Sequence, residues 1–147
     1  RVHRQRRHTD IFYVDSTHGN DLWTGRNPTV QGTEGPFRTL NRAIENIRKV
    51  RRSLEDEVTL YVRSGTYFQR KKIYLDIRDS NLAIIAFDGG ERPLISGGAK
   101  ISRDSFIPMY QTDRHVIYGA PFTGRMPRQI MHFTRNVIYV NNTRAHL

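Results

Sequence analysis

The sequence predicts a mainly β fold with one α-helix, and three observations along its 147 residues support this. Apolar residues recur at three- and four-residue steps between Leu40 and Leu54, which is the period of one helix face. From Val58 to Arg63, apolar and polar residues alternate instead, which is typical of a half-buried strand. Further short apolar runs follow, and Gly, Asp, Asn or Pro separates most of them.

The predicted helix has two distinct faces and a defined start. Its apolar face holds Leu40, Ala43, Ile44, Ile47, Val50 and Leu54, and its polar face holds Arg42, Glu45, Lys49 and Arg52. Thr39 is the expected N-cap, because its hydroxyl can accept a hydrogen bond from a free N–H of the first turn. We expect the apolar face to form a lid over the open end of the strand array, with Ile44 and Ile47 at its centre.

The expected strands lie on both sides of this helix. The first strand is Ile11 to Val14, and a loop rich in Gly, Asn, Asp and Thr leads from it to the helix. The later strands are expected at Val58–Arg63, Lys72–Leu75, Leu82–Phe87, Leu94–Ser96, Lys100–Ile107, His115–Tyr118, Gln129–Phe133 and Val137–Val140.

Strand-like segments also recur at similar intervals along the chain. Leu60 and Ile84 are 24 residues apart, and Ile73 and Leu94 are 21 residues apart. A recurrence of 20 to 50 residues indicates a solenoid, although this one is irregular. By themselves the residues therefore indicate a β-rich domain more firmly than any particular β architecture.

Five segments carry a resemblance to a known family. They are Phe12-Tyr-Val-Asp15, Gly19-Asn-Asp21, Gly35-Pro-Phe37 through Ala43-Ile44, Val58-Thr-Leu-Tyr-Val-Arg-Ser-Gly-Thr-Tyr67 and Pro93-Leu-Ile-Ser-Gly-Gly98. In this order they resemble the N-terminal part of right-handed parallel β-helix proteins of the pectate-lyase-like superfamily. Large secreted β-helix glycoside hydrolases are the most similar members. The resemblance covers roughly Ile11 to Val140.

The resemblance implies a right-handed parallel β-helix, a solenoid, with an N-terminal capping α-helix. Residues 1–10 would be a basic arm, and residues 11–147 would be the cap and the first coils of that domain. A solenoid needs a cap at each end, and Ala145-His146-Leu147 is too short to form one. The chain also begins without Met. We therefore expect these residues to be a fragment of a longer β-helix polypeptide.

The resemblance also implies a function on extracellular polysaccharides, either as a glycoside hydrolase or as a lyase. The alternative is a non-catalytic β-helix that serves as a carbohydrate-binding, adhesion or matrix protein. In the family the catalytic carboxylates usually lie on later coils, so the resemblance assigns no catalytic residue here. We expect the 147 residues alone to cleave no glycan. Acidic residues clustered beyond Leu147 would favour the enzyme, and apolar or small residues there would favour the alternative.

The residues themselves supply candidate acids and bases without singling any out. Glycoside hydrolysis requires two carboxylates that face one sugar, roughly 5–10 Å apart. The candidate acids are Asp76, Asp79, Asp88, Glu91, Asp104 and Asp113, most of them in turn-like surroundings. An exposed ion pair with Arg78 would explain Asp76. Polysaccharide lysis would instead need calcium-binding acids on neighbouring coils and a Lys or Arg base, for which the candidates are Arg63, Lys71 and Lys72.

No cofactor is expected, with calcium as the one candidate metal. Asp15, Asn20 and Asp21 offer the oxygen ligands that calcium prefers, but their spacing does not match an EF-hand loop. We favour the alternative that these side chains accept hydrogen bonds from their own backbone in turns. The six histidines form no His-x-x-x-His pair and the chain has no cysteine, so no zinc set is apparent.

Two further sets of residues bear on carbohydrate. Tyr61, Tyr67, Phe68 and Tyr74 could stack on sugar rings. Aromatic side chains in strands are more often packed inside the fold, and we favour that interpretation. Asn141 is a glycosylation candidate, since Asn141-Asn142-Thr143 matches the acceptor sequence of secreted proteins.

The charge of the chain is strongly positive, with a net charge of +10 and a pI near 10.5. Arg1, Arg4, Arg6 and Arg7 concentrate part of it in the basic arm. Such an arm suits an anionic partner, which could be nucleic acid, an anionic glycan or phospholipid head groups. We favour a solvated arm over a nucleic-acid site, because a run of charge alone specifies little. No apolar run approaches the ~20 residues of a membrane span.

Overall fold

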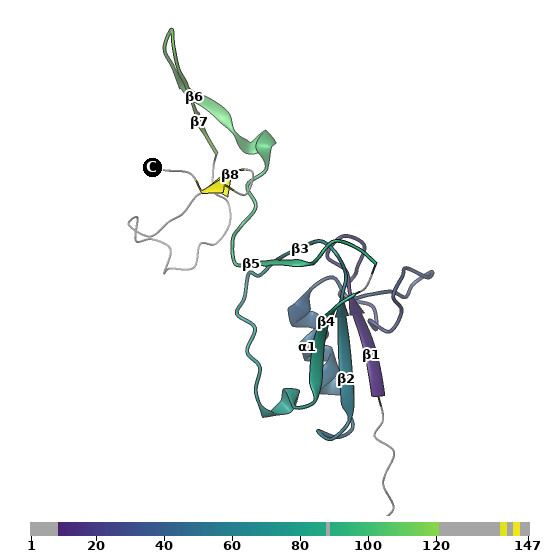
Figure 1. Cartoon of the computed structure of the whole chain (residues 1–147). Coiled ribbons are helices and arrows are strands. Elements are labelled where there is room, and N and C mark those ends of the chain that lie inside the picture. The colour runs from purple at the N-terminus through teal and green to yellow at the C-terminus, as the bar shows by residue number, and fades with distance from the viewer. Residues whose placement is uncertain (1–8, 88, 121–138, 141–142, 145–147) are drawn as a thin grey trace, which may run out of the picture. The chain divides into compact units, whose positions relative to one another are not determined.

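The computed structural model describes residues 9–87, 89–120, 139–140 and 143–144. These residues belong to two compact units, Arg1–Lys100 and Ile101–Leu147 (Figure 1). The first unit contains β1 (Thr9–Val14), α1 (Leu40–Val50), β2 (Glu57–Val62), β3 (Thr66–Phe68), a 3₁₀ turn (Ile77–Asp79), β4 (Leu82–Ala86) and β5 (Leu94–Ser96). The second contains a 3₁₀ turn (Arg103–Ser105), β6 (Ile107–Gln111), β7 (Val116–Gly119), β8 (Tyr139–Val140) and β9 (Thr143–Arg144).

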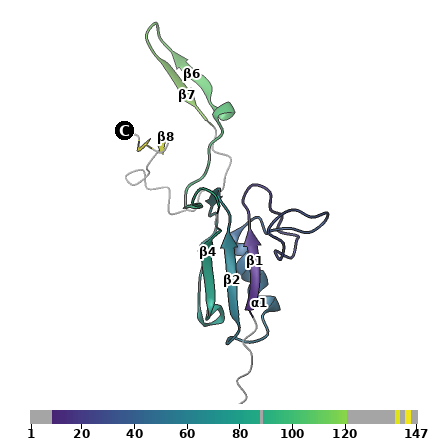
Figure 2. The same ribbon diagram turned by 45° about the vertical axis from the view of Figure 1, so that its right-hand side comes forward.

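A parallel sheet of β1, β2 and β4, in that order, forms the frame of the first unit. Phe12 of β1 lies beside Leu60 of β2, and Leu60 lies beside Ile84 of β4. Helix α1 connects β1 to β2 and covers one face of the sheet in both views (Figures 1 and 2). A second parallel sheet pairs β3 with β5.

The hydrophobic core lies between this sheet and α1. It consists of Phe12, Val14, Phe37, Leu40, Ala43, Ile44, Ile47, Val58, Leu60, Val62 and Tyr67, all of them buried. The alternation predicted for β2 is confirmed, since Val58, Leu60 and Val62 all point into the core. The predicted helix face is confirmed for its first two turns, so α1 does cover the apolar side of the sheet.

The helix starts where the sequence predicts and ends earlier. The Thr39 hydroxyl accepts a hydrogen bond from the Arg42 N–H at 3.2 Å, which confirms the N-cap. The backbone of Arg51 is extended, with φ −65° and ψ 132°. Its guanidinium group donates to the carbonyl oxygens of Leu54 and Asp56, at 2.8 and 2.6 Å, and so stabilises a turn in place of another helical turn. Leu54 therefore lies outside the helix and is about half exposed.

The predicted β-helix is wrong for the described residues. A β-helix stacks successive coils into long parallel sheets, whereas this chain forms a small mixed α/β unit with one helix and two short parallel sheets. The next unit contains antiparallel pairs, β6 with β7 and β8 with β9. The two strand-like segments around Leu60 and Ile84 are neighbouring parallel strands, in which these two residues lie side by side. Leu94 pairs with Thr66 and not with a strand at Ile73.

Besides shifts of one or two residues at the ends of β1, β2, β4 and β7, three strands differ from the prediction. Residues 72–75 form no strand. Two of their carbonyl oxygens accept hydrogen bonds from side chains of α1, Lys72 from Asn41 and Tyr74 from Arg48. Lys100–Ile107 contains a 3₁₀ turn, and the strand begins only at Ile107. Strand β3 is not among the expected strands, and it forms where its three residues pair with β5.

Several predictions fall partly or wholly outside the described residues. These are the basic arm with Arg1, Arg4, Arg6 and Arg7, the strand Gln129–Phe133, the first half of Val137–Val140, the candidate acid Asp88 and the glycosylation candidate Asn141.

Candidate functional site

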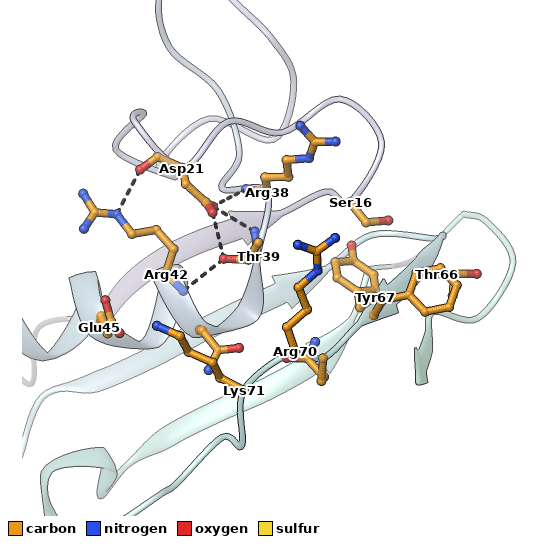
Figure 3. Close-up of a pocket in the computed structure, with 13 residues that line it drawn as sticks. Ser16, Asp21, Arg38, Thr39, Arg42, Glu45, Thr66, Tyr67, Arg70 and Lys71 are labelled. Carbon is orange, nitrogen blue, oxygen red and sulfur yellow. Dashed lines mark hydrogen bonds between the residues drawn. The ribbon is translucent and has the colours of Figure 1, made fainter. Parts of the chain in front are cut away.

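A groove of about 630 Å³ lies beside the N-terminal end of α1 (Figure 3). Ser16, which follows β1, Thr66 at the start of β3, and the first turn of the helix all line it. It is therefore close to the carboxyl ends of β1 and β2. In open α/β sheets, ligands typically bind at this end of the strands and at the N-termini of helices.

Asp21 fills the N-terminus of the helix. One carboxylate oxygen accepts hydrogen bonds from the backbone N–H groups of Arg38 and Thr39, each at 2.9 Å. The other oxygen accepts from the Thr39 hydroxyl at 2.8 Å. The helix dipole favours a negative charge here, and the chain supplies that charge itself. An anionic ligand in the groove would therefore have to bind to side chains.

The groove carries an excess of positive charge. Arg38 comes from the loop before α1, Arg42 from the helix, and Arg70 and Lys71 from the segment after β3 (Figure 3). The Arg42 Nε donates to the carbonyl oxygen of Asp21 at 2.9 Å. The exposed side chains of the other three cations make no ion pair with any described residue. They remain available to an anionic ligand.

Two aromatic residues of β3 take different roles at this groove. Phe68 lines it with 42% of its surface exposed, and so offers a ring face. Tyr67 is buried, and its hydroxyl lies 3.0 Å from the carbonyl oxygen of Val14 and 2.8 Å from that of Arg63. Burial raises the pKa of Tyr67, so the hydroxyl stays a donor that ties β1 to the end of β2. Of the four candidate stacking residues, Phe68 is the one that both lines the groove and is exposed.

The other two aromatic candidates lie elsewhere. Tyr61 stacks on Tyr13 of the neighbouring strand, with ring centres 5.7 Å apart, and Phe87 meets both rings edge-on. Tyr74 is exposed, outside the groove, and its carbonyl oxygen accepts from Arg48. The packing interpretation holds for Tyr61 and Tyr67.

The three calcium candidates have other roles: Asp15 and Asn20 accept hydrogen bonds within turns, and Asp21 caps α1. Asp15 accepts from the backbone N–H groups of Thr17 and His18 at 2.8 and 3.0 Å, and Asn20 accepts from Leu22 at 3.0 Å. Burial opposes ionisation of Asp15, but these hydrogen bonds and nearby His18 lower its pKa below the usual value. Within the described part of the chain, no three His, Cys, Asp or Glu side chains are grouped to hold a metal.

The candidate acids and bases do not converge on the groove. Asp76 pairs with Arg78, as the sequence suggested, at 2.6 Å, and Asp79 pairs with Arg48 at 2.5 Å. Asp104 and Asp113 belong to the second unit. Of the candidate bases, Lys71 lines the groove, whereas Arg63 lies 3.5 Å from Asp15 and donates to the Pro28 carbonyl. The acids that do line the groove are Asp21, which the sequence suggested only as a calcium ligand, and Glu45, which was not a candidate.

No family model, curated protein or solved structure matches this chain. The resemblance to the pectate-lyase-like superfamily stays a prediction. In the described residues, none of the helices has the length and apolar content needed to cross a membrane.

Proposed function

We propose that the unit Arg1–Lys100 binds an acidic polysaccharide in the groove beside α1, as a binding module that acts outside the cell. A polysaccharide is the partner that the sequence resemblance also implies. We assign the described residues to binding and not to catalysis, because Asp76 and Asp79 are paired with arginines and none of the described candidate acids is among the residues that line the groove.

The observation that carries this proposal is the set of three cations without ion-pair partners among the described residues. Arg38, Arg70 and Lys71 line a groove that opens at the surface. The groove also contains the acid Glu45, whose side chain forms no ion pair with another described residue. Cations can pair with the carboxylates of an acidic glycan, and Glu45 can accept hydrogen bonds from sugar hydroxyls. The exposed ring of Phe68 adds an apolar surface on which one face of a sugar can pack.

Affinity electrophoresis and titration calorimetry with polygalacturonate test the proposal, with dextran as the neutral glycan. The variant R70A/K71A removes two groove cations. The control K49A/R52A removes the same charge from exposed positions outside the groove. An exposed ion pair contributes about 0.2–1 kcal/mol, so the groove variant should bind polygalacturonate roughly 2- to 30-fold more weakly.

The pattern across ligands decides the outcome. The proposal is supported if binding of polygalacturonate weakens with added salt and if the groove variant, but not its control, shows the expected loss of affinity. Phe68→Ala should also weaken binding, and this loss should persist at high salt because it is not electrostatic. Equal losses in the groove variant and its control, or equally tight binding of duplex DNA, would contradict a polysaccharide groove.

A further inference from the structure

The three-stranded sheet has two very different edges. At the β1 edge, the loop before α1 pairs with the strand: the Tyr13 N–H donates to Gly25 at 2.7 Å and the Phe37 N–H donates to Tyr13 at 2.9 Å. Strand β4 forms the other edge, and in the described part of the chain it pairs with β2 only. Within the residues that the structure describes, one edge of the sheet is covered and the other is unpaired.

Alternate residues of β4 point their backbone groups toward that open side. The Val58 N–H donates to Asn81 at 3.0 Å, and the Phe87 N–H donates to Val62 at 2.8 Å. In a parallel ladder every second residue bonds to the same neighbour. Ala83 and Ile85 therefore bond to β2, and the N–H and C=O groups of Leu82, Ile84 and Ala86 point away from it.

The open edge also lacks the features that usually protect one. Natural edge strands carry charges, prolines or bulges that prevent pairing with another chain. Residues 82–87 contain no charged residue and no proline. Ile84 and Ile85 are 40% and 46% exposed, although Ile84 continues the column of Phe12 and Leu60, which are buried. The composition of β4 is therefore that of a strand that pairs with another strand.

We propose that two copies of this chain associate by antiparallel pairing of their β4 strands, with the two-fold axis at Ile84. In this register the outward-facing backbone groups of Leu82, Ile84 and Ala86 meet the same three residues of the second copy in reverse order. Leu82 lies opposite Ala86 of the second copy, and Ala83 opposite Ile85, so a large side chain meets a small one on each face. Because the β1 edge of the three-stranded sheet is already paired, this sheet can add one further copy and no more.

Sedimentation over a range of concentrations, with amide hydrogen exchange at each one, tests this dimer. The expected result is a species of twice 17.2 kDa, favoured by salt because each copy carries a net charge of +10. Protection of the Leu82, Ile84 and Ala86 amides should rise with concentration. The Ala83 and Ile85 amides should be protected at every concentration, since they bond to β2.

A pair of double variants tests the register. Ala83 and Ile85 are exposed and lie opposite each other across the proposed two-fold axis. A83K/I85K places like charges opposite and should weaken the dimer at least about tenfold, whereas A83K/I85E places opposite charges there and should retain it. Thermal unfolding of each double variant shows whether it is folded. If one of them is not folded, hydrogen exchange of the unmodified chain still tests the proposed dimer.

Three results would overturn the proposal. One is a monomer at all concentrations, and another is assembly beyond two copies. The third is concentration-independent protection of the Leu82, Ile84 and Ala86 amides, which would show that the chain's own residues cover the edge. Equal behaviour of the two double variants would overturn the register.

Discussion

Arg48 and Asp79 form a bidentate ion pair that ties α1 to the turn Ile77–Asp79. The Arg48 Nε donates to one carboxylate oxygen of Asp79 at 2.8 Å and the Nη2 to the other at 2.5 Å, while the same Nη2 also donates to the Tyr74 carbonyl at 2.6 Å. Asp79 is buried, and it also accepts from the Asp76 N–H at 2.8 Å. The pair holds the segment between β3 and β4 against the helix.

Asp79→Asn should therefore destabilise the fold by roughly 1.5–3 kcal/mol, the range for a hydrogen bond to a charged group. Urea unfolding measures the change. Glu55→Gln, at an exposed position in the loop after α1, is the control and should have little effect. A loss for Asp79→Asn no larger than that of the control would show that the ion pair does not contribute to stability.

The same pair gives a pH dependence with a definite sign. The hydrogen bonds from Arg48 lower the pKa of Asp79 in the folded state. A lowered pKa contributes stability that is complete above the unfolded-state pKa of about 3.9 and is lost as the pH falls through the folded-state pKa. Between about pH 5 and pH 2, the unmodified chain should lose more stability than Asp79→Asn. Parallel acid unfolding curves would contradict this.

Ile47→Ala tests the packing of α1 on the sheet. Ile47 is 1% exposed in the centre of the helix face, so truncation should cost roughly 2–5 kcal/mol in denaturant unfolding. Val50 is on the same helix but 43% exposed, and Val50→Ala should cost much less. A change below about 0.5 kcal/mol for Ile47→Ala would mean that the helix does not cover the core.

Gly25→Ala tests the covered edge of β1. Gly25 has φ +73°, and a Cβ there would come within 2.0 Å of the Phe37 ring, which is buried. Gly32 has φ +59°, but no atom lies within 4 Å of the position that its Cβ would take. Gly32→Ala should cost only about 1 kcal/mol for the backbone conformation, and Gly25→Ala clearly more. Equal melting temperatures of the two variants would contradict the close packing of this loop.

Catalysis is expected to be absent from these 147 residues. Reducing-sugar and unsaturated-product assays on a panel of polysaccharides measure it. The physical reason is that Asp76 and Asp79 are neutralised by arginines and that Asp21 caps the helix. Turnover that disappears on replacing Asp21 or Glu45 by the corresponding amide would instead place an active site in the groove.

Local patterns in the sequence were sufficient for several elements. Thr39, α1 and β2 follow from capping and periodicity, which depend on residues within one or two turns of each other. Leu94–Ser96 was predicted with its observed bounds, since apolar residues bounded by turn residues indicate a strand. The favoured turn roles of Asp15 and Asn20 also follow from local hydrogen bonding.

Only the tertiary structure decided how these elements are used. Asp21 caps a helix through Thr39, which is 18 residues away. Strand β3 forms by pairing with β5. Arg70 and Lys71 reach the groove because the segment after β3 packs beside α1. The mixed α/β architecture depends on such distant pairings as well. Whether a short segment forms a strand, and whether a cation lines the groove, depends on residues that are distant in the sequence. The local periodicity of the sequence contains no information about those residues.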